Sequence, residues 1–179
     1  MTVQSAYQKA IKFAAEKHIG QTVPGTEIPY VVHLSNVAME IMIAAKHSEG
    51  FDLEFAVQVA LLHDVLEDTE TAFSEIERNF GIEIANAVLA LSKRSGIKKE
   101  EKMSDSLNRI KQQRKEVWAV KIADRITNLQ RPPRHWDSDK IMNYKIQARE
   151  ILDCLKNGNE YLEQRLNSKI SEYEDFCFN

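Results

Sequence analysis

Glycine and proline are scarce in this sequence, and cysteine is scarcer still. The 179 residues include 6 glycines, 4 prolines and 2 cysteines. With so few turn-forming residues, long segments run uninterrupted, which favours helices over a β fold with many tight turns. Cys154 and Cys177 have neither the spacing of a metal site nor the number that a disulfide framework needs.

Three further absences limit the classes of function. Lysine and arginine total 24 against 27 acidic residues, so the net charge of −3 provides no basic field for nucleic acid. No apolar run approaches the roughly 18 residues that span a bilayer. The amphipathic N-terminus lacks the apolar segment of a signal peptide. We therefore expect a cytoplasmic protein that has neither nucleic acid nor a membrane as its partner.

Helical periodicity is present along almost the whole chain. Hydrophobic residues make up 43% and charged residues 28%, as in ordinary globular proteins, and the length suits one domain over residues 1–179. Breakers such as Pro24, Gly25 and Gly158 separate the periodic segments. The pattern predicts an all-α fold, a single-domain helical bundle. Its expected helices are 3–19, 30–46, 53–66, a short helix capped by Ser74 and ending at Phe80, 83–91, 117–129, 138–155 and 159–176.

Residues 98–116 are rich in charge and poor in apolar side chains. A solvated helix or a mobile loop is the simpler interpretation of such a segment. The alternative is a basic flap that faces phosphate groups, with Lys93, Arg94, Lys98 and Lys99 as its cations. The sequence alone leaves both interpretations open.

The apolar helix expected at 53–66 leads into a cluster of titratable side chains. His63, Asp64, Glu67 and Asp68 fall within six consecutive positions. Residues four apart share a helix face, so His63 lies over Glu67 and Asp64 lies over Asp68. Buried carboxylates need a hydrogen-bond donor, an opposite charge or a metal ion. A divalent cation would satisfy the cluster, although a helix end with Glu67 and Asp68 in solvent would also explain it.

Two more candidate ligands lie far away in the sequence. His33 stands at the start of the second expected helix, directly after a loop. Asp124 is a single acid near the centre of an apolar helix, with Lys121 beside it on the same face. A structural role would explain either residue by itself. Together with His63 and Asp64 they supply two imidazoles and two carboxylates, a donor set that suits Mn, Fe or Zn.

The order His…His-Asp…Asp resembles the HD superfamily of metal-dependent phosphohydrolases, which are all-helical. Four segments are similar to the hydrolase domain of the RelA/SpoT alarmone enzymes: PYVVH at 29–33, ALLHDVLEDT at 60–69, FG at 80–81 and KIADRITNL at 121–129. The resemblance covers the chain from about Ala10 to Leu155, and no synthetase segment follows in this sequence. The chain therefore resembles the stand-alone small alarmone hydrolases of the MESH type.

This resemblance implies a function and a set of site residues. The implied reaction is hydrolysis of (p)ppGpp to GDP or GTP plus pyrophosphate, with a nucleotide as the small-molecule substrate and Mn²⁺ as the expected divalent metal. The implied metal ligands are His33, His63, Asp64 and Asp124. The pair that activates the attacking water corresponds to Glu67 and Asp68. The implied substrate contacts are Asn128, Lys140, Tyr144, Trp136 and Lys99, with Ser92 beside the same pocket.

The sequence departs from that family in the loop before the first histidine. The family carries a basic pair there that grips the guanine nucleotide, whereas the loop from Gln21 to Ile28 has no lysine or arginine. Leu34 also replaces the family's proline. Two alternatives therefore stay open. One is an HD phosphohydrolase for another nucleotide, such as the 2′-phosphate of NADPH or another nucleotide 3′-phosphate; the other is a non-catalytic helical module that binds nucleotide. The oligomeric state is also open.

Overall fold

The computed structural model of the protein describes residues 1–177, except for the side chain of Lys99. In this part of the chain an isolated bridge between Thr22 and Pro29 is the only β-type pairing, so the all-α prediction is confirmed. The elements are α1 (Val3–Lys17), α2 (Val31–Ala45), α3 (Leu53–Leu62), α4 (Val65–Asp68), α5 (Phe73–Phe80), α6 (Ile82–Leu91), η1 (Lys99–Glu101), α7 (Lys102–Lys111), α8 (Lys115–Asn128), α9 (Ser138–Cys154), α10 (Glu160–Tyr173) and η2 (Glu174–Phe176).

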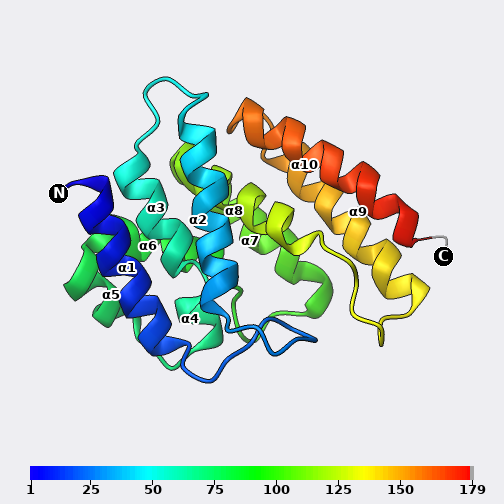
Figure 1. Ribbon diagram of the computed structural model, residues 1–179, viewed down its shortest axis with the longest axis horizontal. Helices are drawn as coiled ribbons and strands as arrows, with labels where there is room; N and C mark the ends of the chain where they lie inside the picture. Colours follow the sequence, from blue (N-terminus) through cyan, green and yellow to red (C-terminus); the bar gives the residue numbers. More distant parts are fainter. Residues whose placement is uncertain (178–179) are drawn as a thin grey trace.

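Helices α3 and α8 form the centre of the molecule. Every residue from Phe55 to Leu62 is buried, and α8 is buried over most of the stretch from Val117 to Ile126. A helix that is apolar on all sides must be covered on all sides. α1 and α2 pack on α3, and α2 and α10 pack on α8 (Figure 1).

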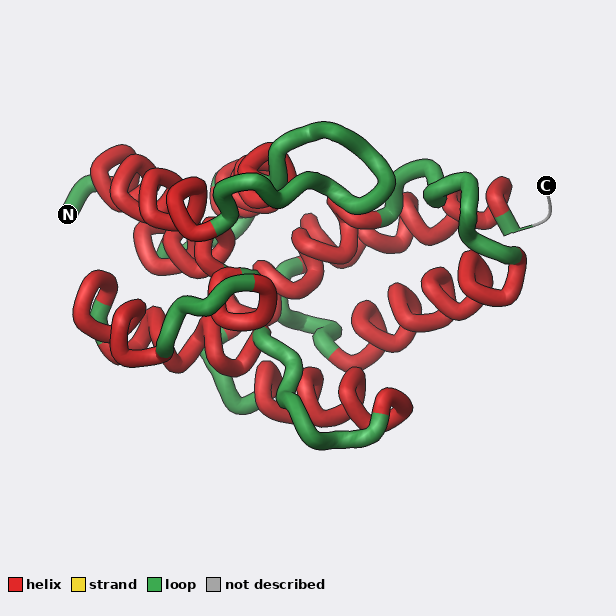
Figure 2. Tube along the Cα trace, turned by 90° about the horizontal axis from the view of Figure 1, so that it is seen from below, coloured by secondary structure: helices red, strands yellow, loops and turns green. Residues whose placement is uncertain are grey.

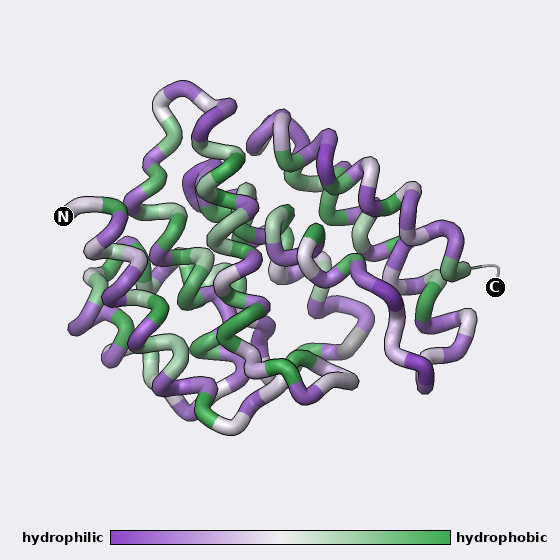
Figure 3. The backbone as a smooth tube through the Cα atoms, in the orientation of Figure 1, coloured by the Kyte–Doolittle hydropathy of each residue, from purple (hydrophilic) through white to green (hydrophobic). Residues whose placement is uncertain are grey.

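The outer helices are amphipathic and enclose this centre. Figure 3 shows hydrophobic and hydrophilic residues alternating along them, as helices with one buried face require. Figures 1 and 2 show the two chain ends at opposite ends of the long axis, with α1 beside the N-terminus and the α9–α10 hairpin towards the C-terminus. None of the described helices combines the length and the apolar character needed to cross a membrane.

The prediction of one continuous helix across residues 53–66 is wrong. The helix stops one residue before His63 and resumes one residue after Asp64. His63 Nδ1 lies 2.8 Å from the carbonyl oxygen of Ala60, and the hydroxyl of Tyr30 donates to Asp64 at 2.5 Å. These two side-chain bonds fix His63 and Asp64 in the turn, where the backbone hydrogen bonds of the helix do not continue.

Two other local predictions need correction. Ser74 does not cap α5, because this helix already begins at Phe73. In the turn before α5, the hydroxyl of Thr69 accepts the N–H of Thr71 at 3.1 Å. Within 98–116 the loop interpretation is also wrong, because η1, α7 and the first turn of α8 occupy most of the segment. α7 buries Leu107 on the core, so it is a packed helix with one solvated face.

Candidate active site

Side chains from distant parts of the chain converge where α2, α8 and the turn after α3 meet. One possible ligand atom from each of His33, His63 and Asp64 lies within 4.8 Å of the other two. Asp124 of α8 lies against the same group, with Oδ1 3.5 Å from His33 Nε2 and 3.7 Å from His63 Nε2. Only 6% of His33 and 3% of His63 is exposed. The structure thus brings the four predicted ligands together in one buried space.

Both imidazoles present the same nitrogen to this space. His63 Nδ1 donates to the carbonyl of Ala60, so Nε2 carries the lone pair of the neutral ring. His33 Nδ1 lies 3.3 Å from the hydroxyl of Thr127, which leaves its Nε2 facing the same group. His63 Nε2 is buried, lies 2.9 Å from Asp64 Oδ2 and receives no hydrogen bond from any residue in the described part of the chain. A buried, oriented nitrogen without a donor fits a metal ligand, so these residues suit a divalent ion.

Both carboxylates are fixed by neighbouring side chains. Tyr30 donates its hydroxyl hydrogen to Asp64 Oδ2. Asn128 Nδ2 donates to Asp124 Oδ1 at 2.5 Å, and the ammonium of Lys121 donates to Asp124 Oδ2 at 3.0 Å. Lys121 and Asn128 therefore share the helix face of Asp124, as the spacing predicted. These bonds orient the acids without help from an ion.

Electrostatics favour the charged form of both acids. Burial by itself would raise the pKa of Asp124, but Lys121 and the two imidazoles hold it well below its ordinary value. Burial acts in the same direction on Asp64, yet the imidazole of His63 lowers that pKa to about 2. Burial lowers the pKa of His63, and the two carboxylates outweigh it and raise the pKa well above its ordinary value. Two ionised carboxylates at this depth need a cation beside them.

The predicted acid pair, Glu67 and Asp68, lies one turn further along, on α4. Lys93 binds Glu67 through its backbone N–H at 2.8 Å and through its ammonium at 2.6 Å. None of the described residues donates a hydrogen bond to the carboxylate of Asp68, and partial burial together with the charges of Asp64 and Glu67 raises its pKa. Asp68 is therefore the freer proton acceptor, whereas Glu67 is held in one position.

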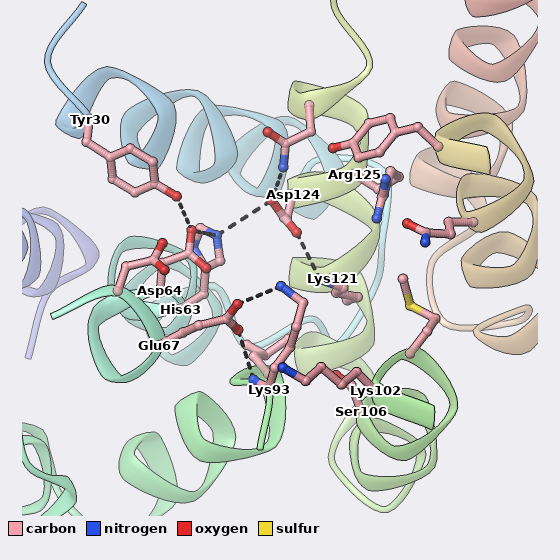
Figure 4. A pocket seen from close by; sticks show the side chains of 16 residues that line it. Tyr30, His63, Asp64, Glu67, Lys93, Lys102, Ser106, Lys121, Asp124 and Arg125 are labelled. Atoms are coloured by element: carbon pink, nitrogen blue, oxygen red, sulfur yellow. Dashed lines mark hydrogen bonds and ion pairs between the residues drawn. The ribbon is translucent and has the colours of Figure 1, made fainter. Parts of the chain in front are cut away.

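These side chains line a cavity of about 570 Å³, which we call the polar cavity (Figure 4). This volume is in the usual range for small-molecule sites. Its lining is dominated by titratable residues: Tyr30, His63, Asp64, Glu67, Asp68, Leu91, Lys93, Lys102, Met103, Ser106, Lys121, Asp124, Arg125, Asn128, Tyr144 and Gln147.

A second cavity, of about 440 Å³, shares Asn128 and Tyr144 with the first, and we call it the apolar cavity. The loop between α1 and α2 forms part of its wall. Another part comes from the segment just before α9, which carries Trp136. Its lining residues are Val23, Pro24, Thr26, Ile28, Val32, His33, Asn36, Thr127, Asn128, Gln130, Arg131, Pro133, Trp136 and Tyr144. Three of the five predicted substrate contacts therefore line one cavity or both.

The other predicted contacts are placed differently. The ammonium of Lys140 lies over the ring of Trp136, 4.4 Å from its centre, and Lys140 is not among the described residues that line either cavity. The side chain of Lys99 lies outside the described residues. Ser92 is buried and donates its hydroxyl to a carbonyl of its own helix. Of the proposed flap cations, Lys93 lines the polar cavity.

Sequence reasoning missed Tyr30, Lys102, Ser106 and Arg125 as lining residues. The spacing of Met103, Leu107 and Ile110 was a usable signal for α7, because residues three and four apart share one face. That face packs on the core and carries Lys102 and Ser106 towards the polar cavity. Tyr30 and Arg125 lie within the family-like segments at 29–33 and 121–129, but the resemblance assigned neither of them a role.

The chain has relatives that match over most of its length. A family model described as an HD domain matches residues 10–154. Two relatives are named guanosine-3′,5′-bis(diphosphate) 3′-pyrophosphohydrolase MESH1. The protein from Xenopus tropicalis is 32% identical, with 89% of each chain covered. The protein from Danio rerio is 30% identical, with 92% of each chain covered.

A solved structure of similar shape gives a TM-score of 0.82 at 26% identity, and the match covers 94% of this chain and 95% of that one. That structure is described as a metazoan ortholog of SpoT that hydrolyses ppGpp and plays a role in starvation responses. The similarity therefore extends over the whole arrangement of helices and not only over the segments that carry the candidate ligands.

Proposed function

This chain belongs to the HD-domain family, and from that premise we propose that it hydrolyses the 3′-pyrophosphate of (p)ppGpp to give GDP or GTP and pyrophosphate. The observation that carries the proposal is the buried group of His33, His63, Asp64 and Asp124. The last three of these line the polar cavity together with the acid pair, and His33 lines the adjoining apolar cavity. The relatives that bear this activity in their names, and match most of the chain, support the same reaction.

The four residues of the buried group are the proposed ligands of a divalent metal, with Mn²⁺ as the expected ion. Imidazole nitrogens and carboxylate oxygens suit a borderline metal of this kind. Such an ion, when bound, polarises a phosphoryl oxygen and lowers the pKa of a water molecule. The protein contributes orientation, because Ala60 and Thr127 already direct both imidazoles and Asn128 directs Asp124.

Asp68 and Glu67 are the proposed proton acceptors for the attacking water. The water attacks the phosphorus attached to the ribose 3′ oxygen, and the bond between these two atoms breaks. The 3′ oxygen takes up a proton and becomes the hydroxyl of GDP or GTP, while the oxygen of the water becomes part of the released pyrophosphate. General-base assistance of this kind is typically worth about 10²–10⁴-fold in rate. Asp68 accepts the proton more readily, because Glu67 is engaged by Lys93 on both oxygens. The raised pKa of Asp68 makes it a stronger base than an ordinary aspartate.

The apolar cavity is the proposed site of the nucleoside. The rings of Trp136 and Tyr144 lie edge to face with their centres 5.2 Å apart, and a flat base can pack on such a wall. Asn128 lines both cavities and so can reach the sugar or the base. Lys140 and Lys99 complete the proposed substrate contacts.

We further propose that residues 1–179 act as one catalytic domain in the cytoplasm. Buried residues of α2, α3 and α8, which carry or adjoin the candidate ligands, belong to one hydrophobic core with those of the other long helices. The free thiols of Cys154 and Cys177 are in keeping with a reducing compartment.

A second candidate function is hydrolysis of another nucleotide phosphate, such as the 2′-phosphate of NADPH. One observation favours it: the loop from Gln21 to Ile28, which walls the apolar cavity, offers no lysine or arginine to a guanine nucleotide. Arg131 is the only lysine or arginine among the described residues that line this cavity.

Product analysis with Mn²⁺-loaded protein tests both candidates. We expect ppGpp to give GDP and pyrophosphate, with activity lost on chelation and restored by Mn²⁺. Release of phosphate from NADPH without turnover of ppGpp would favour the second candidate. A protein with full metal occupancy that hydrolyses neither compound, nor any other nucleotide phosphate in a panel that includes nucleotide 3′-phosphates, would refute both and would leave the non-catalytic binding module.

A further inference from the structure

Arg125 is a buried cation that the proposed mechanism does not use. It follows Asp124 on α8, and only 6% of it is exposed. Its guanidinium lies over the ring of Tyr144, 4.2 Å from the ring centre, and it lines the polar cavity. Figure 4 shows Arg125 on the side of this cavity away from Glu67 and Asp64.

The hydrogen-bonding capacity of Arg125 is incompletely satisfied. Its Nε and Nη1 atoms are buried and have no hydrogen-bond partner among the described residues. The guanidinium lies over the ring of Tyr144, a contact that supplies no acceptor for its planar set of N–H donors. Burial raises the pKa of Tyr144, so its phenol stays neutral and supplies no negative charge. A buried cation with unused donors is costly unless an anion reaches it.

The other cations of the polar cavity divide into two kinds. Lys93 is bonded to Glu67, and Lys121 is bonded to Asp124, so protein acids already balance both. Lys102 of α7 lines the same cavity and has no ion-pair or hydrogen-bond partner in the part of the chain that the structure describes. Arg125 and Lys102 therefore remain as two uncompensated cations facing one enclosed space.

We propose that Arg125 and Lys102 form an anion site for the distal phosphate of the diphosphate group that is cleaved. This rests on the proposed function and deepens it, because it makes the site selective for a diphosphate ester over a monophosphate ester. The proximal phosphate belongs beside the candidate metal ligands, and the distal phosphate continues into the same cavity. A guanidinium can bind two phosphate oxygens at once, which suits the unused N–H groups of Arg125. A monophosphate ester would leave both cations unpaired.

The test compares binding of inorganic pyrophosphate and inorganic phosphate to the Mn²⁺-loaded protein by calorimetry. The variants are Arg125→Gln, Lys102→Gln and the charge-preserving Arg125→Lys. Arg149→Gln is the matched control, because it removes the same charge from an exposed residue of α9 that bonds only to Asn167 among the described residues. Arg125→Gln should weaken pyrophosphate binding roughly 10-fold to 100-fold, the usual effect of a lost charge-assisted contact. Phosphate binding should stay within about twofold.

A kinetic measurement addresses the same point with substrates. The ratio of kcat/KM for ppGpp to that for its 3′-monophosphate analogue should fall by the same factor in Arg125→Gln, and Arg125→Lys should recover part of it. Equal loss for the two substrates, or equal weakening of phosphate and pyrophosphate, would show that Arg125 has only a structural role and would overturn the proposal.

Two controls keep the outcome decisive. Thermal unfolding and metal content show whether each variant is folded. If Arg125→Gln is not folded, Lys102→Gln provides the test. Unchanged pyrophosphate binding in Lys102→Gln then overturns the anion site. Because binding needs no turnover, wild-type protein that binds pyrophosphate through these residues but leaves ppGpp intact supports the anion site while refuting the proposed function.

Discussion

The polar cavity and the apolar cavity meet at Asn128 and Tyr144 but are lined by opposite kinds of residue. Acids and cations occur in equal number around the polar cavity, whereas Arg131 is the only charged side chain other than histidine among the described residues of the apolar cavity. Bond cleavage needs charges in fixed positions, and recognition of a ring system needs apolar area of the right shape. In the proposed function, the polar cavity therefore determines the reaction and the apolar cavity determines which nucleotide is accepted.

The largest effect should come from removing a candidate metal ligand. His63→Ala should abolish stoichiometric Mn²⁺ binding and lower kcat/KM by roughly 10³-fold or more, since the ion supplies both polarisation and an acidic water. Elemental analysis and steady-state kinetics measure the two quantities. His47→Ala is the control, because His47 is exposed and stacks on Tyr161 away from both cavities. Full metal content and activity in His63→Ala would remove the chemical role of the polar cavity.

The next effect separates metal binding from proton transfer within the polar cavity. Glu67→Gln combined with Asp68→Asn should lower kcat by about 10²–10⁴-fold, with Mn²⁺ still bound. Asp68→Asn by itself should account for most of the loss, because Lys93 occupies the carboxylate of Glu67. Glu70→Gln, an exposed neighbour, controls for the change of charge. Unchanged turnover in the double variant would favour the non-catalytic binding module.

The apolar cavity should respond in KM and not in kcat. Trp136→Ala removes a candidate stacking surface, and base–aromatic stacking is worth about 1–3 kcal/mol, so KM for ppGpp should rise roughly 10-fold. The value of kcat should stay within about threefold. Ile146→Ala, which truncates an exposed apolar residue on α9, serves as control. A fall in kcat as large as the rise in KM would show that the two cavities do not divide these roles.

The sequence predicted the candidate metal ligands of the polar cavity better than the residues that surround them. His63, Asp64 and Asp124 stand out because charged groups in apolar helices must be compensated by something. The roles of the surrounding residues depend on contacts between distant segments, which no local pattern in the sequence records. Arg125 follows Asp124 directly, but whether its guanidinium finds an acid depends on which helices face it. Tyr30 bonds to Asp64 only because α2 and the turn after α3 lie together.

Fold prediction shows the same limit on a smaller scale. Apolar periodicity was sufficient for the long helices, because burying one face determines them. Periodicity did not reveal the break in the helix at His63. There the imidazole bonds to the carbonyl of Ala60 and competes with a backbone N–H for it, and a pattern of apolar residues does not record this competition. α7 was obscured for another reason: charged residues dilute the apolar spacing that packs Leu107 on the core.

The smallest effect should come from a region outside both cavities, the N-terminus of α3. The carboxylate of Asp52 accepts the N–H of Phe55 at 3.0 Å and bonds to Arg114 at 2.8 Å. Asp52→Ala should lower the free energy of unfolding by about 1 kcal/mol, the usual cost of a lost N-cap. Asp52→Asn, which keeps an acceptor, should lose less, and urea denaturation measures both.

The pH dependence gives this last prediction its sign. Burial works to raise the pKa of Asp52, but Arg114 and the N–H of Phe55 outweigh it and lower the pKa. A lowered pKa in the folded state stabilises the protein above the unfolded value of about 3.9. The difference between wild type and Asp52→Ala should therefore be complete at neutral pH and shrink as the pH falls below that value. For Asp52→Ala, kcat and KM should not change at neutral pH. A change in Mn²⁺ affinity would mean that α3 transmits strain from its N-terminus to His63 at its other end. The contrast between the two cavities would then not be sufficient to explain function.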